Sequence, residues 1–184
     1  FNQQSCDNEA FNACLHPFIR NTIGSMDFGG SALNKFYNAT NTPNRGSKRL
    51  TSDVFALATA VMFQSAVQHF ALAPNNLTDA PEWAINFMKE VPTTWDEVRF
   101  IDGYPGRYVV LARRHGDSWY VAGVNAQKEL LKIKVTLPMF QGLKEVKLYS
   151  DDEQLNGRLT SVKVGKKQEF ELIIPQNGGV VIVN

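Results

Sequence analysis

A change of hydrophobic period in the middle of the chain limits what it can fold into. Before about residue 95 the apolar residues recur at helical spacing, as in the series from Ala84 to Val91. After Val98 they alternate with polar residues, as in Leu131 to Thr136, which is the period of a strand. Because one pattern does not satisfy both structures, the change predicts two parts, residues 1–97 and residues 98–184.

The second part is predicted to be all β. Residues 108–115 and 118–125 are apolar runs separated by Gly116-Asp117, which is typical of a β-hairpin with a two-residue turn. Further alternating runs follow up to Val183. Seven or eight short strands in so few residues predict an antiparallel β-sandwich over 98–184.

The first part is predicted to alternate helices with short strands. A helix after Asp7 or Asn8 would carry an apolar stripe of Phe11, Leu15, Phe18 and Ile19, and Pro17 would kink it. A strand over 23–28 and a loop over 34–48 come next. A buried helix over 53–65, capped by Thr51 or Ser52, precedes a strand over 67–71 and a last helix that begins at Pro81.

This order of elements is typical of parallel βα units. Two strands do not make a domain, so either these residues cap the sheet behind them or they end a larger (β/α)₈ barrel. We favour the second interpretation. The predicted fold class is therefore α/β plus all-β, with the last βα units of a barrel followed by a sandwich.

Composition excludes several classes of function. Residues 1–98 carry six Lys/Arg against nine Asp/Glu, and residues 99–184 carry thirteen against nine. This weak positive charge lies on alternating strand positions, so we expect no nucleic-acid partner. The apolar run from Val54 to Ala66 is too short to span a bilayer, and no apolar h-region follows Phe1, so we expect neither a membrane span nor a signal peptide in this sequence. Cys6 and Cys14 are predicted to be reduced thiols, and no spacing of histidine or cysteine predicts a metal site.

Three residues of the first part are candidates for substrate binding. Asp27 follows a predicted strand, where barrel enzymes place their functional groups, but it could equally hydrogen-bond a turn. Arg20 could hold a hydroxyl or a carboxylate group of a substrate, or it could interact with the dipole at the C-terminus of a helix or pack there. His69 ends the second predicted strand and could face the site or lie in the core. Catalysis by a pair of carboxyl groups needs two of them close together, and a single candidate predicts no catalytic pair.

The chain resembles glycoside hydrolase family 97 over essentially its whole length. His16-Pro-Phe-Ile-Arg-Asn21 and Gly24-Ser-Met-Asp-Phe28 resemble a helix and the seventh strand of that family's barrel. Phe55 to Gln64 with Val67-Gln-His-Phe70 resembles its next helix and eighth strand. Pro92-Thr-Thr-Trp-Asp-Glu97 with Asp102-Gly-Tyr-Pro-Gly106 resembles the junction with its C-terminal β-domain.

The resemblance implies what the complete protein does. It implies an exo-acting α-glucosidase or α-galactosidase that acts on oligosaccharides with calcium in the periplasm. The family's calcium-binding and catalytic glutamates lie upstream of the matched segment. We therefore expect the 184-residue chain to be inactive, with no catalytic residue and no calcium of its own.

Another interpretation makes the chain a non-catalytic module for carbohydrate binding or oligomerisation. Trp95, Trp119 or Tyr120 would then stack on sugar rings, which requires that they be exposed. We also expect self-association, because the helix over 53–65 is apolar on more than one face. Its interface is predicted within residues 11–72.

Overall fold

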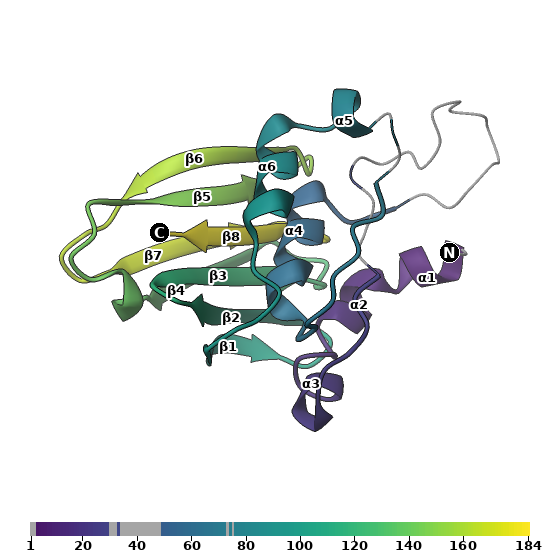
Figure 1. Cartoon of the computed structure of the whole chain (residues 1–184), viewed down its shortest axis with the longest axis horizontal. Coiled ribbons are helices and arrows are strands. Elements are labelled where there is room, and N and C mark those ends of the chain that lie inside the picture. The colour runs from purple at the N-terminus through teal and green to yellow at the C-terminus, as the bar shows by residue number, and fades with distance from the viewer. Residues whose placement is uncertain (1–2, 30–32, 34–48, 73, 75) are drawn as a thin grey trace.

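The chain is described by a computed structural model that covers residues 3–29, 33, 49–72, 74 and 76–184. The predicted loop over 34–48 lies outside the described residues. Short helices come first and strands follow, as Figure 1 shows. The helices are α1 (Gln3–Asp7), α2 (Glu9–Ala13), α3 (Arg20–Ile23), α4 (Asp53–Met62), α5 (Asn76–Asp79) and α6 (Glu82–Glu90).

Eight strands form two antiparallel sheets. A six-stranded sheet has the order β1-β2-β3-β8-β5-β6, and β4 pairs with β7 in a separate two-stranded sheet. The strands are β1 (Glu97–Tyr104), β2 (Tyr108–His115), β3 (Ser118–Asn125), β4 (Leu131–Thr136), β5 (Glu145–Asp151), β6 (Gly157–Lys163), β7 (Glu169–Ile174) and β8 (Gly179–Val183), with a 3₁₀ turn η1 (Pro138–Phe140) before β5. The predicted all-β second half and its hairpin at Gly116-Asp117 are confirmed.

The six-stranded sheet buries a different core on each face. Alternate residues of β2, β3 and β8, such as Leu111, Tyr120 and Val181, pack with the helices. Their neighbours, such as Ala112 and Ile182, pack with β4 and β7. The molecule is therefore layered as helices, large sheet and small sheet, and Figure 1 shows the helices gathered at one side of the strands.

Helix α4 is the central helix of the first core. The Ser52 hydroxyl accepts a hydrogen bond from Phe55 N at 2.8 Å, as the capping prediction requires. Every residue from Val54 to Met62 is buried, and β3 and β8 supply most of its neighbours. The expectation that this helix leaves an apolar surface to recruit a second chain is wrong, because the large sheet covers it.

The start of the chain differs from the prediction. α2 ends at Ala13 and is followed by turns up to Ile19, so the expected continuous stripe does not form. Phe11 and Ile19 are more than half exposed, while the small residues Ala10 and Ala13 face the core. The thiols of Cys6 and Cys14 are free and buried, as predicted.

The two strands predicted for the first half do not form, and a single parallel β-bridge joins their segments. Phe28 and Gln68 form a parallel bridge, supported by hydrogen bonds from Met26 N to Gln64 O at 2.8 Å and from His69 N to Phe28 O at 3.1 Å. The segments lie side by side in the expected direction without becoming strands. The described residues thus give helices with one parallel bridge, followed by antiparallel sheets. No helix among them is long and apolar enough to cross a membrane.

Candidate functional site

Asp27 and His69 lie on the two bridged segments. Asp27 precedes Phe28 and His69 follows Gln68, the residues that form the bridge. Both side chains are exposed, whereas Phe28 is buried and the Gln68 side chain donates to Ala60 O of α4 at 2.8 Å. Asp27 and His69 therefore lie on neighbouring segments. Their exposed side chains alternate with those of Phe28 and Gln68, which face the rest of the molecule.

Arg20 stands apart from these two residues. It begins α3, is exposed, and lies close enough to His16 for its charge to act on that ring. Burial, and next the charge of Arg20, lower the pKa of His16 below its ordinary value. Within the described residues no hydrogen bond or ion pair joins Arg20, Asp27 and His69, so their roles in substrate binding stay predictions.

A small cavity beside Asp27 contains a second carboxylate. This cavity of about 220 Å³ is lined by Asp27, Glu9 and His16, among other residues. Glu9 Oε2 accepts a hydrogen bond from the Thr51 hydroxyl at 2.9 Å. The cavity is below the usual size of ligand pockets, about 300–1,000 Å³, and can hold little more than a hydroxyl-bearing group between its polar side chains.

A larger cavity lies where the first half meets β1 and β2. Its volume is about 360 Å³, and its lining includes Trp95, Asp96, Glu97 and Arg113. Arg113 is only 5% exposed, and it lies on the same face of β2 as the core residues Val109 and Leu111. An arginine at a core-facing strand position is the sequence signal that could have drawn attention to this cavity, and the sequence reasoning missed it.

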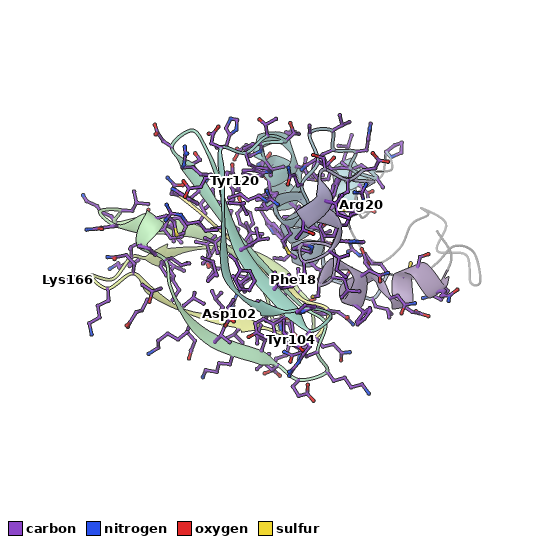
Figure 2. The ribbon with its side chains drawn as sticks, turned by 90° about the horizontal axis from the view of Figure 1, so that it is seen from below. Phe18, Arg20, Asp102, Tyr104, Tyr120 and Lys166 are labelled. Atoms are coloured by element: carbon purple, nitrogen blue, oxygen red, sulfur yellow. The ribbon has the colours of Figure 1, made fainter. Side chains whose placement is uncertain are left out.

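The expected sugar-stacking platforms are not exposed. Trp119 and Tyr120 are 8% and 7% exposed, and they belong to opposite cores of the large sheet. Trp95 is half-buried and packs edge to face on Tyr120, with ring centroids 5.4 Å apart. Figure 2 shows Tyr120 within the body of the molecule. The interpretation that Trp119 or Tyr120 stacks on a sugar is therefore wrong.

A calcium ion is usually held by several oxygen ligands, carboxylates among them. The described part of the chain contains no group of three or more histidine, cysteine, aspartate or glutamate side chains that could hold a metal ion. The calcium that the family resemblance implies for the complete protein stays a prediction.

Comparison with known proteins identifies the second half of the chain. Residues 94–183 match the family model described as glycosyl-hydrolase 97 C-terminal, oligomerisation. A retaining α-galactosidase of Bacteroides thetaiotaomicron is 36% identical over 113 residues, which are 59% of this chain and 16% of that protein.

Solved structures match the whole chain. A β-arabinopyranosidase crystal structure is 59% identical, with a TM-score of 0.94 over 100% of this chain and 29% of that one. A glycoside hydrolase family 97 enzyme from Pseudoalteromonas sp. strain K8 shares the fold, with 24% identity and a TM-score of 0.78 over 99% of this chain and 30% of that one. This chain thus spans less than a third of each of these relatives.

Proposed function

Because the chain is the C-terminal region of a glycoside hydrolase family 97 protein, we propose that it joins the end of a catalytic barrel to a β-domain through which the complete enzyme associates. Residues 1–97 supply the last βα units of that barrel, and residues 98–184 form the β-domain. The parallel bridge between Phe28 and Gln68 supports the first assignment, since barrel strands are parallel. The family description supports the second.

The proposed activity of the complete protein is hydrolysis of galacto-configured glycosides. One relative is named a retaining α-galactosidase, and the relative that is 59% identical over the whole chain is named a β-arabinopyranosidase. A β-L-arabinopyranoside has the ring configuration of an α-D-galactoside and lacks only the exocyclic hydroxymethyl group. This shared configuration, together with the 59% identity, favours β-L-arabinopyranosides and α-D-galactosides over α-glucosides, which are the competing substrate class.

This chain contributes structure to that activity and no catalytic carboxylate. The acid and the nucleophile of a retaining enzyme stand about 5–5.5 Å apart across the scissile bond. The family resemblance puts both groups, and the glutamates that hold calcium, upstream of the segment matched here. Asp27, Arg20 and His69 are proposed to contact the sugar from the end of the barrel, and the periplasm is the proposed location.

The test is an assay of the complete protein and of the 184-residue chain side by side. The p-nitrophenyl glycosides of β-L-arabinopyranose, α-D-galactose and α-D-glucose serve as substrates, before and after removal and return of calcium. We expect the complete protein to cleave the first two at least tenfold faster than the third, and to lose activity without calcium. The 184-residue chain should cleave none of them. Preference for the glucoside would contradict the substrate proposal. Turnover by the 184-residue chain would contradict the proposal that the catalytic carboxylates lie upstream of it.

A further inference from the structure

The cavity lined by Trp95, Asp96, Glu97 and Arg113, here called the Arg113 cavity, has walls fixed by hydrogen bonds. On one side Asp96 N donates to Arg114 O at 2.8 Å, and Asp96 Oδ2 accepts from Gly116 N at 2.7 Å. On the other side Gln64 N donates to Asn21 Oδ1 at 3.2 Å. Since both walls are anchored to neighbouring elements, the polar groups of the cavity are held in place before any ligand arrives.

Arg113 lines this cavity and carries a buried hydrogen-bond donor. Its Nη2 donates to Met62 O, the last residue of α4, at 3.1 Å. Its Nε is buried, and no residue in the described part of the chain accepts a hydrogen bond from it. Burial lowers the pKa of Arg113 to about 10, so the guanidinium is still charged at neutral pH. A buried donor without an acceptor is unfavourable, and a ligand oxygen would correct this.

Trp95 supplies a second donor of the same kind. Its indole Nε1 is buried and finds no acceptor among the described residues. Buried indole N–H groups ordinarily have a partner. The two residues that carry these unpaired donors line the same cavity, and its lining also includes the hydroxyl-bearing residues Ser25, Thr93 and Thr94.

The charges around the cavity argue against an anionic ligand. The carboxylates of Asp96 and Glu97 line it as well, and they would repel an anion that approached Arg113. Both are held by Arg114, at 3.6 Å from Asp96 and 3.4 Å from Glu97, and Glu97 also pairs with Arg99 at 2.6 Å. The lining therefore offers donors and acceptors with nearly balanced charge, which suits a neutral molecule that carries several hydroxyl groups.

We propose that the Arg113 cavity binds one pyranose unit of a neutral carbohydrate, with ring or hydroxyl oxygens accepting from Arg113 Nε and Trp95 Nε1 and hydroxyl groups donating to the carboxylates. At about 360 Å³ it lies at the small end of ligand pockets, which fits a single sugar ring. In this role Trp95 acts through its N–H edge and not as a stacking platform. The inference does not depend on which glycoside the complete protein cleaves.

The test follows the donors themselves by ¹⁵N–¹H NMR of the 184-residue chain. The indole N–H signals of Trp83, Trp95 and Trp119 are assigned with Trp→Phe variants, and D-galactose, L-arabinose and D-glucose are added up to about 100 mM, since single sugars bind weakly. We expect a saturable shift of the Trp95 indole and of the Arg113 Nε–H. The Trp83 and Trp119 indoles are the internal controls and should stay in place.

Two conservative variants separate binding from folding. Trp95→Phe keeps the ring and removes the N–H, and Arg113→Lys keeps the charge and removes Nε–H. Each should weaken sugar binding at least tenfold, while the remaining backbone signals keep their dispersion. The same titration of the complete protein, labelled with fluorotryptophan and read by ¹⁹F NMR, should move the signal that Trp95→Phe deletes.

Three results would overturn the proposal. The first is a Trp95 indole signal whose chemical shift does not change with any of the three sugars in either protein. This would mean that solvent or another segment satisfies the donors. The second is a response to sodium acetate but not to sugars, which would assign the cavity to carboxylates. The third is unchanged sugar affinity in both variants.

Discussion

Asp151, at the end of β5, is a buried carboxylate that connects three elements. Its Oδ2 accepts hydrogen bonds from the Ser52 hydroxyl, which caps α4, and from Gly179 N of β8 at 2.8 Å. Burial raises the pKa of Asp151 from 3.8 to about 6, although these two hydrogen bonds oppose the rise. The carboxylate thus links the N-terminus of α4 to β8, and its burial there disfavours the ionised form.

Because the pKa of Asp151 is raised, we predict that the free energy of unfolding depends on pH. Between about pH 4 and 6 the folded chain keeps a proton on Asp151 that the unfolded chain has released. The free energy of unfolding therefore falls as pH rises through this window and levels off above it. Asp151→Asn removes this dependence, so the unfolding free energy of the wild type minus that of the variant should fall by up to about 3 kcal/mol between pH 4 and 7. Urea unfolding at several pH values measures it.

Asp152 is the matched control for this titration. It lies at the surface and is partly exposed, and hydrogen bonds from the backbone and side chain of Asn156 lower its pKa. Its ionised form is favoured in the folded chain, so its contribution to stability is lost as pH falls. The wild type minus Asp152→Asn should change with pH in the opposite direction. Equal slopes in both variants would show that Asp151 does not titrate as described.

At the scale of elements, α4 lies directly on the backbone of β8. A Cβ added to Gly179 would come within 2.7 Å of Phe55 N and Phe55 Cα. Contacts this short to backbone atoms cannot be relieved by a rotamer change. Gly179→Ala should therefore push the helix off the sheet and destabilise the chain by about 1–3 kcal/mol.

Thermal or urea unfolding of Gly179→Ala checks this packing. Gly165 is the control, because a Cβ there would meet no atom within 4 Å and its backbone is not in the left-handed region. Gly165→Ala should be neutral or slightly stabilising. A Gly179→Ala protein as stable as the control would mean that helix and strand do not pack this closely.

The elements that the sequence could predict are those with a strong local pattern. Alternation located β4, β5 and β7, because each of them turns one side to a core and the other to solvent. β2, β3 and β8 have a core on both sides and are recognisable as short apolar runs. The buried helix α4 and its Ser52 cap followed from an apolar run behind a hydroxyl residue. The paired order of the sheets needed the structure, since β5 and β3 meet β8 only after long intervals of chain.

The elements that failed depend on contacts that are distant in sequence. The segment over 23–28 has strand-like residues, but it finds a single bridge to Gln68 and stays irregular. The stripe of Phe11 and Ile19 failed because α2 stops at Ala13 and only small residues fit against the core there. Of the predicted site, Asp27 and His69 were brought near one another. The Arg113 cavity needs residues from four separate segments, and no local pattern could assemble them.

At the scale of the whole molecule, the two edges of the large sheet differ in how they meet solvent. β6 carries Arg158 and Lys163 toward its ends, which discourages pairing with another chain. β1 carries Val98 and Phe100, 55% and 59% exposed, beside a cavity that Phe18 also lines. The Phe18 ring packs edge to face on Phe100, with ring centroids 5.7 Å apart, and Figure 2 labels Phe18 together with Asp102 of β1. We therefore predict that a second copy contacts the β1 edge.

The family description suggests self-association, and variants at the two edges of the sheet can locate the interface. A lysine at Phe100 would put an unpaired charge into an apolar contact, so Phe100→Lys should weaken association of the complete protein roughly 30-fold, about 2 kcal/mol. Leu159→Lys, on the β6 edge, is the control and should associate like the wild type. Ile23→Lys tests the earlier expectation of an interface within residues 11–72, because Ile23 is 82% exposed on α3. Light scattering over a range of concentrations measures all three.

If only Ile23→Lys yields monomers, the interface lies on the helices. If Phe100→Lys keeps the mass of the wild type, the β1 edge is not the contact.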